Sequence, residues 1–115
     1  MEAELLIDKR KLKRFIVNVK ILDRETNQCL GYSANMHTKG MLITSTDRLP
    51  LNKLLKIKLV HIQFDDEVIE IPLNINGLWS KPSNNSDFHN TGFNIVEPTQ
   101  EQIHAVNSVI EELAI

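Results

Sequence analysis

The most concentrated chemistry in the sequence is a basic run near the N-terminus. Five of the six residues from Lys9 to Arg14 are lysine or arginine, and only Leu12 interrupts them. Arg10 and Arg14 stand four positions apart. Because a guanidinium is planar and charged, it can grip phosphate or the O6/N7 edge of guanine with two parallel hydrogen bonds and can stack on a base. The run therefore has the chemistry of an anion-binding arm, with a solvated basic tail as the plain alternative.

The rest of the chain limits what such an arm can bind. The 115 residues carry 15 acidic and 13 basic side chains, a net charge of −2. This balance argues against binding of duplex nucleic acid, which usually rests on a broadly basic surface. One Trp and one Tyr also give few stacking platforms for a single strand. A small anionic ligand held by one local cluster remains compatible with the charge.

No other set of residues predicts catalysis or metal binding. The histidines His37, His61, His89 and His104 fall in separate segments without metal-ligand spacing. Cys29 has no second cysteine to pair with, and we expect it to be a small core residue. The sequence holds no nucleophile elbow, P-loop or dinucleotide-binding motif. We therefore expect a protein that is not an enzyme and uses no cofactor.

The basic run must be positioned by the rest of the chain, whose sequence pattern predicts mainly β-strands. Apolar and polar residues alternate in short segments separated by polar turns, at 15–22, 29–36, 40–46, 56–64, 68–75, 77–81 and 91–96. In the fifth segment Ile69, Ile71, Leu73 and Ile75 are expected to face inward, and Pro72 indicates an edge or a bulge. Six or seven consecutive short strands predict an antiparallel barrel or sandwich, since closure protects strand edges.

After Pro98 the spacing of the apolar residues changes from the alternation of a strand to the period of a helix. Thr99 is a good N-cap, and Gln102 stands in the capping-box position three residues later. One face of the following segment is apolar and comprises Ile103, Val106, Ile110 and Leu113. Glu111 and Glu112 are expected on its solvated face. The pattern predicts an amphipathic helix over about 99–113 that packs on the sheet or plugs one end of it.

The order of these features resembles that of a PilZ domain, the bacterial receptor module for cyclic di-GMP. The first motif of that family, R-x-x-x-R just before the first strand, matches Arg10 to Arg14. The second, [D/N]-x-S-x-x-G in a strand-connecting turn, is similar to Asn35–Gly40. The serine position holds His37, which is a departure from the family pattern.

The C-terminal half also looks similar to that family in layout. It has a strand with Trp79, a variable loop, the pair Gly92 and Phe93 at the start of the last strand, and a terminal helix. The likeness implies a six-stranded antiparallel β-barrel of the split-barrel type with a C-terminal helix. It divides the chain into a flexible basic arm, residues 1–14, and a single domain, residues 15–115.

The resemblance also implies roles for individual residues. Arg10 and Arg14 would bind the phosphates and guanine of cyclic di-GMP, and Asn35 would bond to the second guanine region. We expect Gly40 to take a positive φ in the turn and to leave room for close approach. His37, larger than serine, would either clash with the ligand or donate a hydrogen bond in its own way.

The sequence thus predicts a bacterial cyclic di-GMP receptor that signals by conformational change to a partner protein. The alternative is a degenerate PilZ-like adaptor that binds a protein and not the nucleotide. A cytoplasmic location is expected, because the N-terminal segment MEAELLID does not resemble a secretory signal and a lone cysteine fits a reducing compartment. No segment approaches the roughly 18 apolar residues that membrane insertion requires.

Overall fold

A computed structural model of the chain describes residues 19–63, 65–84 and 87–113. Six strands and one helix follow in order: β1 (Val19–Asp23), β2 (Cys29–His37), β3 (Gly40–Ser45), β4 (Leu54–Ile62), β5 (Val68–Pro82), β6 (His89–Ile95) and α2 (Gln100–Leu113). The basic run with Arg10 and Arg14, and the predicted arm of residues 1–14, lie outside the described residues. The structure does not test the predicted boundary between arm and domain.

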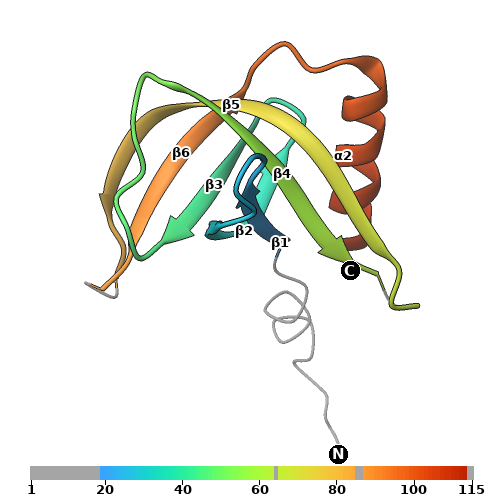
Figure 1. Cartoon of the computed structure of the whole chain (residues 1–115), viewed down its shortest axis with the longest axis horizontal. Coiled ribbons are helices and arrows are strands. Elements are labelled where there is room, and N and C mark those ends of the chain that lie inside the picture. Colours follow the sequence, from blue (N-terminus) through green and yellow to red (C-terminus); the bar gives the residue numbers. More distant parts are fainter. Residues whose placement is uncertain (1–18, 64, 85–86, 114–115) are drawn as a thin grey trace, which may run out of the picture.

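The strands form a closed barrel in the order β1-β2-β3-β6-β5-β4, with every pair antiparallel and with β1 pairing β4 to close the ring (Figure 1). This confirms the predicted six-stranded antiparallel barrel with a C-terminal helix. The two segments expected as separate strands at 68–75 and 77–81 are one continuous strand, β5. The strand count is therefore six, and the expectation of a break between those segments is wrong.

The core follows the alternation that the sequence predicts. Val19 and Ile21 of β1 are buried, as are Ile71, Leu73 and Ile75 of β5. Pro72 faces outward, and its carbonyl accepts a hydrogen bond of 2.7 Å from Nε2 of Gln102 in α2. The pairing of β5 with β6 begins only at Ile75, so Pro72 lies on a free edge on that side, where a missing N–H costs no ladder bond.

α2 covers this unpaired part of β5. Thr99 and Gln102 form the predicted capping box, in which the Gln102 N–H donates to Thr99 Oγ1 over 3.1 Å and the Thr99 N–H donates to Gln102 Oε1 over 2.8 Å. Val106 and Val109 are fully buried against the core, and the helix contacts both β5 and β2 (Figure 1). No helix of the described residues is long and apolar enough to cross a membrane.

Two side chains differ from their predicted surroundings. Glu112 is not a solvated helix residue, because its Oε1 lies 2.6 Å from Nε2 of the buried His61 on β4. Cys29 is exposed rather than part of the core. It starts β2 opposite Leu22, next to a register shift at Ile21 and Leu22 that changes which residues of this hairpin face inward.

Candidate functional site

Strand register aligns residues of four strands in a row across the outer face of the barrel. Asn35 on β2 pairs with Leu42 on β3, Leu42 pairs with Gly92 on β6, and Gly92 pairs with Trp79 on β5. Adjacent strands are spaced by about 4.8 Å, so the row is about 14 Å wide. Residues separated by up to 57 positions in the sequence are thus brought onto one surface.

A second row runs parallel to the first, one pleat further along the strands. His37 pairs with Gly40, Gly40 with Asn94, and Asn94 with Asn76. Of the described residues, Oδ1 of Asn94 is one of two buried side-chain polar atoms that have no hydrogen-bond partner. The site therefore contains an acceptor that a ligand could satisfy.

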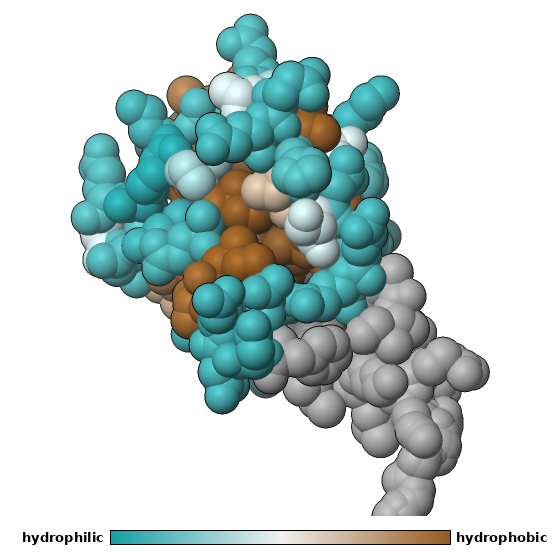
Figure 2. Space-filling model, turned by 90° about the vertical axis from the view of Figure 1, so that its right-hand side faces the viewer, coloured by the Kyte–Doolittle hydropathy of each residue, from teal (hydrophilic) through white to brown (hydrophobic). Residues whose placement is uncertain are grey.

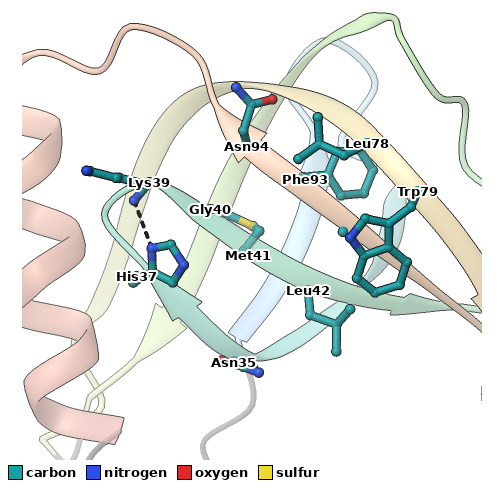
Figure 3. Close-up of a pocket in the computed structure, with 11 residues that line it drawn as sticks. Asn35, His37, Lys39, Gly40, Met41, Leu42, Leu78, Trp79, Phe93 and Asn94 are labelled. Carbon is teal, nitrogen blue, oxygen red and sulfur yellow. Dashed lines mark hydrogen bonds between the residues drawn. The ribbon is translucent and has the colours of Figure 1, made fainter.

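The two rows form a depression of about 450 Å³ on the outer face. In the second row the absence of a side chain at Gly40 leaves space between His37 and Asn94, and in the first row the indole of Trp79 lies over Gly92. Figure 3 shows His37 and Lys39 on one side of it, Leu78 and Trp79 on the other, and Gly40 and Leu42 between them. The predicted residues Asn35, His37 and Gly40 all line this depression.

Trp79 reaches the outer face because of a β-bulge. Gly77 pairs with Phe93 and Trp79 pairs with Gly92, so Leu78 is an extra residue without a partner. The bulge leaves both Leu78 and Trp79 exposed, the latter at 44%. Without it, Trp79 would continue the inward phase of Ile75 and Gly77.

The indole of Trp79 lies directly over Gly92. A Cβ atom at residue 92 would stand 2.4 Å from Cε2 of the ring, so that only glycine accommodates the tryptophan in this position. The Nζ of Lys81 lies 5.5 Å from the centre of the indole, within the range of a cation–π interaction. The site thus combines an exposed aromatic ring with a cation.

Gly40 is required for a reason other than the predicted one. Its φ is not among the positive values of the described chain, so the expectation of a left-handed turn residue is wrong. A Cβ atom at this position would lie 2.7 Å from the carbonyl oxygen of Phe93. Gly40 is therefore glycine because β3 and β6 approach closely at this point.

His37 takes part in the turn that follows it. The ring Nδ1 accepts a hydrogen bond of 3.2 Å from the backbone N–H of Lys39, drawn as a dashed line in Figure 3. A serine hydroxyl can accept the same bond from the residue two positions on. The departure from the family pattern thus preserves a local turn contact and uses one of the two ring nitrogens for it.

The arm joins the barrel beside this depression. Val19, the first described residue, pairs with Ser33, which is two positions before Asn35 on the same strand. Arg14 precedes Val19 by five residues and Arg10 by nine, which corresponds to at most about 17 and 30 Å of extended chain. An extended chain of this length is sufficient for both arginines to reach the site.

Sequence reasoning did not assign Trp79, Asn94 or Lys39 to the site. For Trp79 there was a signal, since two consecutive apolar residues after Gly77 interrupt the alternation and are typical of a bulge. The positions of Asn94 and Lys39 depend on the pairing of β3 with β6 and had no comparable signal.

The chain matches no family model and no curated protein sequence. It is similar to the solved structure of the Bacillus subtilis inhibitor of motility, MotI/DgrA, with a TM-score of 0.61 and 14% sequence identity. The match covers 83% of this chain and 46% of that one, so the chain spans less than half the length of MotI/DgrA. At this identity the likeness concerns the fold alone. Since MotI/DgrA is a PilZ-domain protein, the barrel and its terminal helix constitute a PilZ-like fold.

Proposed function

We propose that this protein is a non-enzymatic receptor for cyclic di-GMP that acts on a protein partner. The observation that supports this most is the common depression lined by Asn35, His37 and Gly40, beside the strand end to which the arginine-bearing arm is joined. The motif residues belong to two strands and their turn, and they face the same surface as an exposed tryptophan. A cyclic dinucleotide with two planar guanine bases and two negatively charged phosphates matches this combination of polar, cationic and aromatic groups.

Each part of the site has a distinct role in the proposal. Arg10 and Arg14 bind phosphate and guanine through charge-assisted hydrogen bonds, which are worth about 1.5–3 kcal/mol each. Asn35 and the unpartnered Oδ1 of Asn94 bond to base edges. Trp79 offers a stacking surface, and stacking of a base on an aromatic ring contributes about 1–3 kcal/mol.

The histidine at position 37, where the family motif has serine, can reduce the binding free energy by only a limited amount. A neutral hydrogen bond lost at this position would weaken binding by about 0.5–1.5 kcal/mol, a few-fold to tenfold in affinity. This is less than the contribution of the two arginines together. Binding therefore survives the substitution unless the imidazole occupies the ligand's own volume.

Isothermal titration of the full chain with cyclic di-GMP tests the proposal. We expect heat of binding at tens of micromolar protein, and a large loss of affinity in Arg10→Ala and in Arg14→Ala. Lys11→Ala and Lys13→Ala are matched controls, since each removes one charge from the same run but no guanidinium. Absence of binding by the unaltered protein would refute the receptor hypothesis.

A second candidate function is a PilZ-like adaptor that binds a protein and not the nucleotide. The imidazole of His37 favours it, because this ring lines the depression where the family pattern has a smaller serine and it occupies space that a ligand would need. The similar protein MotI/DgrA is named as an inhibitor of motility, which is consistent with a regulatory role for either candidate. If His37→Ser creates cyclic di-GMP binding where the natural chain has none, the adaptor is the correct assignment.

A further inference from the structure

The charges of this chain are divided unevenly between its two halves. All but one of the 13 lysines and arginines precede residue 65, whereas nine of the 15 acidic residues follow residue 64. The later acidic residues belong to the β4–β5 connection, the first half of β5, the segments before and after β6, and α2. Three of these carboxylates lie on α2, and Glu70 lies on the part of β5 that α2 covers, where it pairs with Lys58 at 3.6 Å, so carboxylates gather on the side of the barrel that carries α2.

This side has a groove of its own, between the first turns of α2 and the unpaired edge of β5. The α2–β5 groove has a volume of about 420 Å³ and is lined by Glu70, Ile71, Pro72, Thr99, Glu101, Gln102 and Ala105. Ile71, Pro72 and Ala105 supply apolar surface, and the carboxylates of Glu70 and Glu101 stand at its rim. Figure 2 shows this side of the molecule, where hydrophobic side chains lie in a hollow surrounded by hydrophilic ones.

The basic run of the chain has the complementary pattern. Residues 9–14 read Lys-Arg-Lys-Leu-Lys-Arg, so that one apolar side chain is flanked by cations on both sides. A leucine fits the apolar floor of the groove, and guanidinium or ammonium groups fit its acidic rim. Groove and run therefore match in both charge and hydrophobicity.

The length of chain before β1 allows this contact. Lys20 pairs with Val60 on β4, and Val60 pairs with Glu70 on β5, so Glu70 is two strand spacings, about 10 Å, from Lys20. Arg14 precedes Lys20 by six residues, which extend to about 20 Å. Because Val19 also pairs with Ser33 near the nucleotide depression, the arm joins the barrel between the two surfaces.

We propose that residues 9–14 dock in the α2–β5 groove when no nucleotide is bound. Docking in this groove is independent of the proposed function. Its consequence rests on that function, because arginines held by Glu70 and Glu101 are not available to cyclic di-GMP. The acidic side then acts as a competitor for the arm and sets the apparent affinity for the nucleotide.

Amide chemical shifts of the isotope-labelled full chain test the docking without any nucleotide. In a variant with Lys9→Gln, Arg10→Gln and Arg14→Gln, we expect shift changes at Glu70, Glu101 and Ala105. We expect none in the β3–β4 loop, and the differences should disappear in about 1 M salt, where charges are screened within 3 Å. Unchanged groove resonances, or changes that depend on protein concentration and thus report a second copy, overturn the proposal.

Titration with cyclic di-GMP tests the competition. We expect the double variant Glu70→Gln/Glu101→Gln to bind about two- to tenfold more tightly, since two exposed ion pairs are released. Glu25→Gln, at the exposed β1–β2 turn, removes a carboxylate away from the groove and should leave affinity unchanged. Equal affinities of the double variant and the unaltered chain overturn the competition. If neither binds nucleotide, the receptor function fails and the chemical shifts alone decide the docking.

Discussion

The contact between His61 and Glu112 gives a prediction with a magnitude that the structure determines. His61 is 1% exposed, its Nδ1 is buried without a partner among the described residues, and its Nε2 lies 2.6 Å from the Glu112 carboxylate. An ionised carboxylate only accepts, so Nε2 carries the proton and donates. Glu112→Ala would leave both ring nitrogens buried without partners, at a cost of about 1–3 kcal/mol in unfolding free energy.

Urea denaturation measures this cost against two matched variants. Glu111→Ala removes the exposed neighbouring carboxylate and should change the unfolding free energy by no more than about 0.5 kcal/mol. Glu112→Gln keeps an acceptor oxygen and should fall between the two alanine variants. With a denaturant slope of about 1–3 kcal/mol/M, we expect Glu112→Ala to lower the midpoint by roughly 0.5–2 M. Equal midpoints for Glu111→Ala and Glu112→Ala would refute the reasoning that α2 is anchored through the buried imidazole.

Three further predictions concern the site, the helix and the first turn. Gly92→Ala should displace the indole of Trp79, the only tryptophan, and shift its fluorescence emission to longer wavelength; an unchanged spectrum contradicts the contact. Thr99→Ala should lower the unfolding free energy by about 1 kcal/mol through loss of the N-cap, as measured by denaturation, and an unaltered midpoint argues against the capping box. The N–H groups of Thr26 and Glu25 hold the pKa of Asp23 below its ordinary value. The ionised carboxylate therefore stabilises the fold at any pH above its unfolded pKa, which is about 3.9. This contribution is lost as the pH falls through the lower pKa of the folded state. Between pH 5 and pH 2 the stability of Asp23→Asn should therefore fall less than that of the unaltered chain, and parallel decreases exclude this role.

The architecture could be predicted from the sequence because local patterns determine it. Alternation places Ile71, Leu73 and Ile75 inward wherever the strand pairs, and the capping box at Thr99 and Gln102 depends on residues only three positions apart. Closure of the barrel then follows from the cost of leaving strand edges unpaired. These features require no knowledge of which distant residues meet.

The features that sequence reasoning missed depend on contacts between distant segments. Nothing in the helical period of α2 distinguishes Glu112 from Glu111, because the difference is the proximity of His61, 51 residues earlier. A partial signal lay in β4, where Ile57, Leu59 and His61 share the inward phase, so that a buried imidazole needed a partner. The contact that requires a glycine at position 40 is also distant in the sequence, since the carbonyl that approaches Gly40 belongs to Phe93.

The bulge at Leu78 shows how register, rather than residue type, assembles the candidate site. Up to Gly77, odd-numbered residues of β5 face the core, and an uninterrupted strand would bury Trp79 among them. One inserted residue reverses the phase, so that Trp79 stands outside, opposite Gly92, in the same row as Leu42 and Asn35. A deletion of Leu78 should therefore remove the bulge and leave Trp79 outside, because Trp79 would then follow Gly77 directly and still stand opposite Gly92. The depression would lose the apolar side chain of Leu78 from its margin, while its stacking surface and the motif residues on β2 would remain in place.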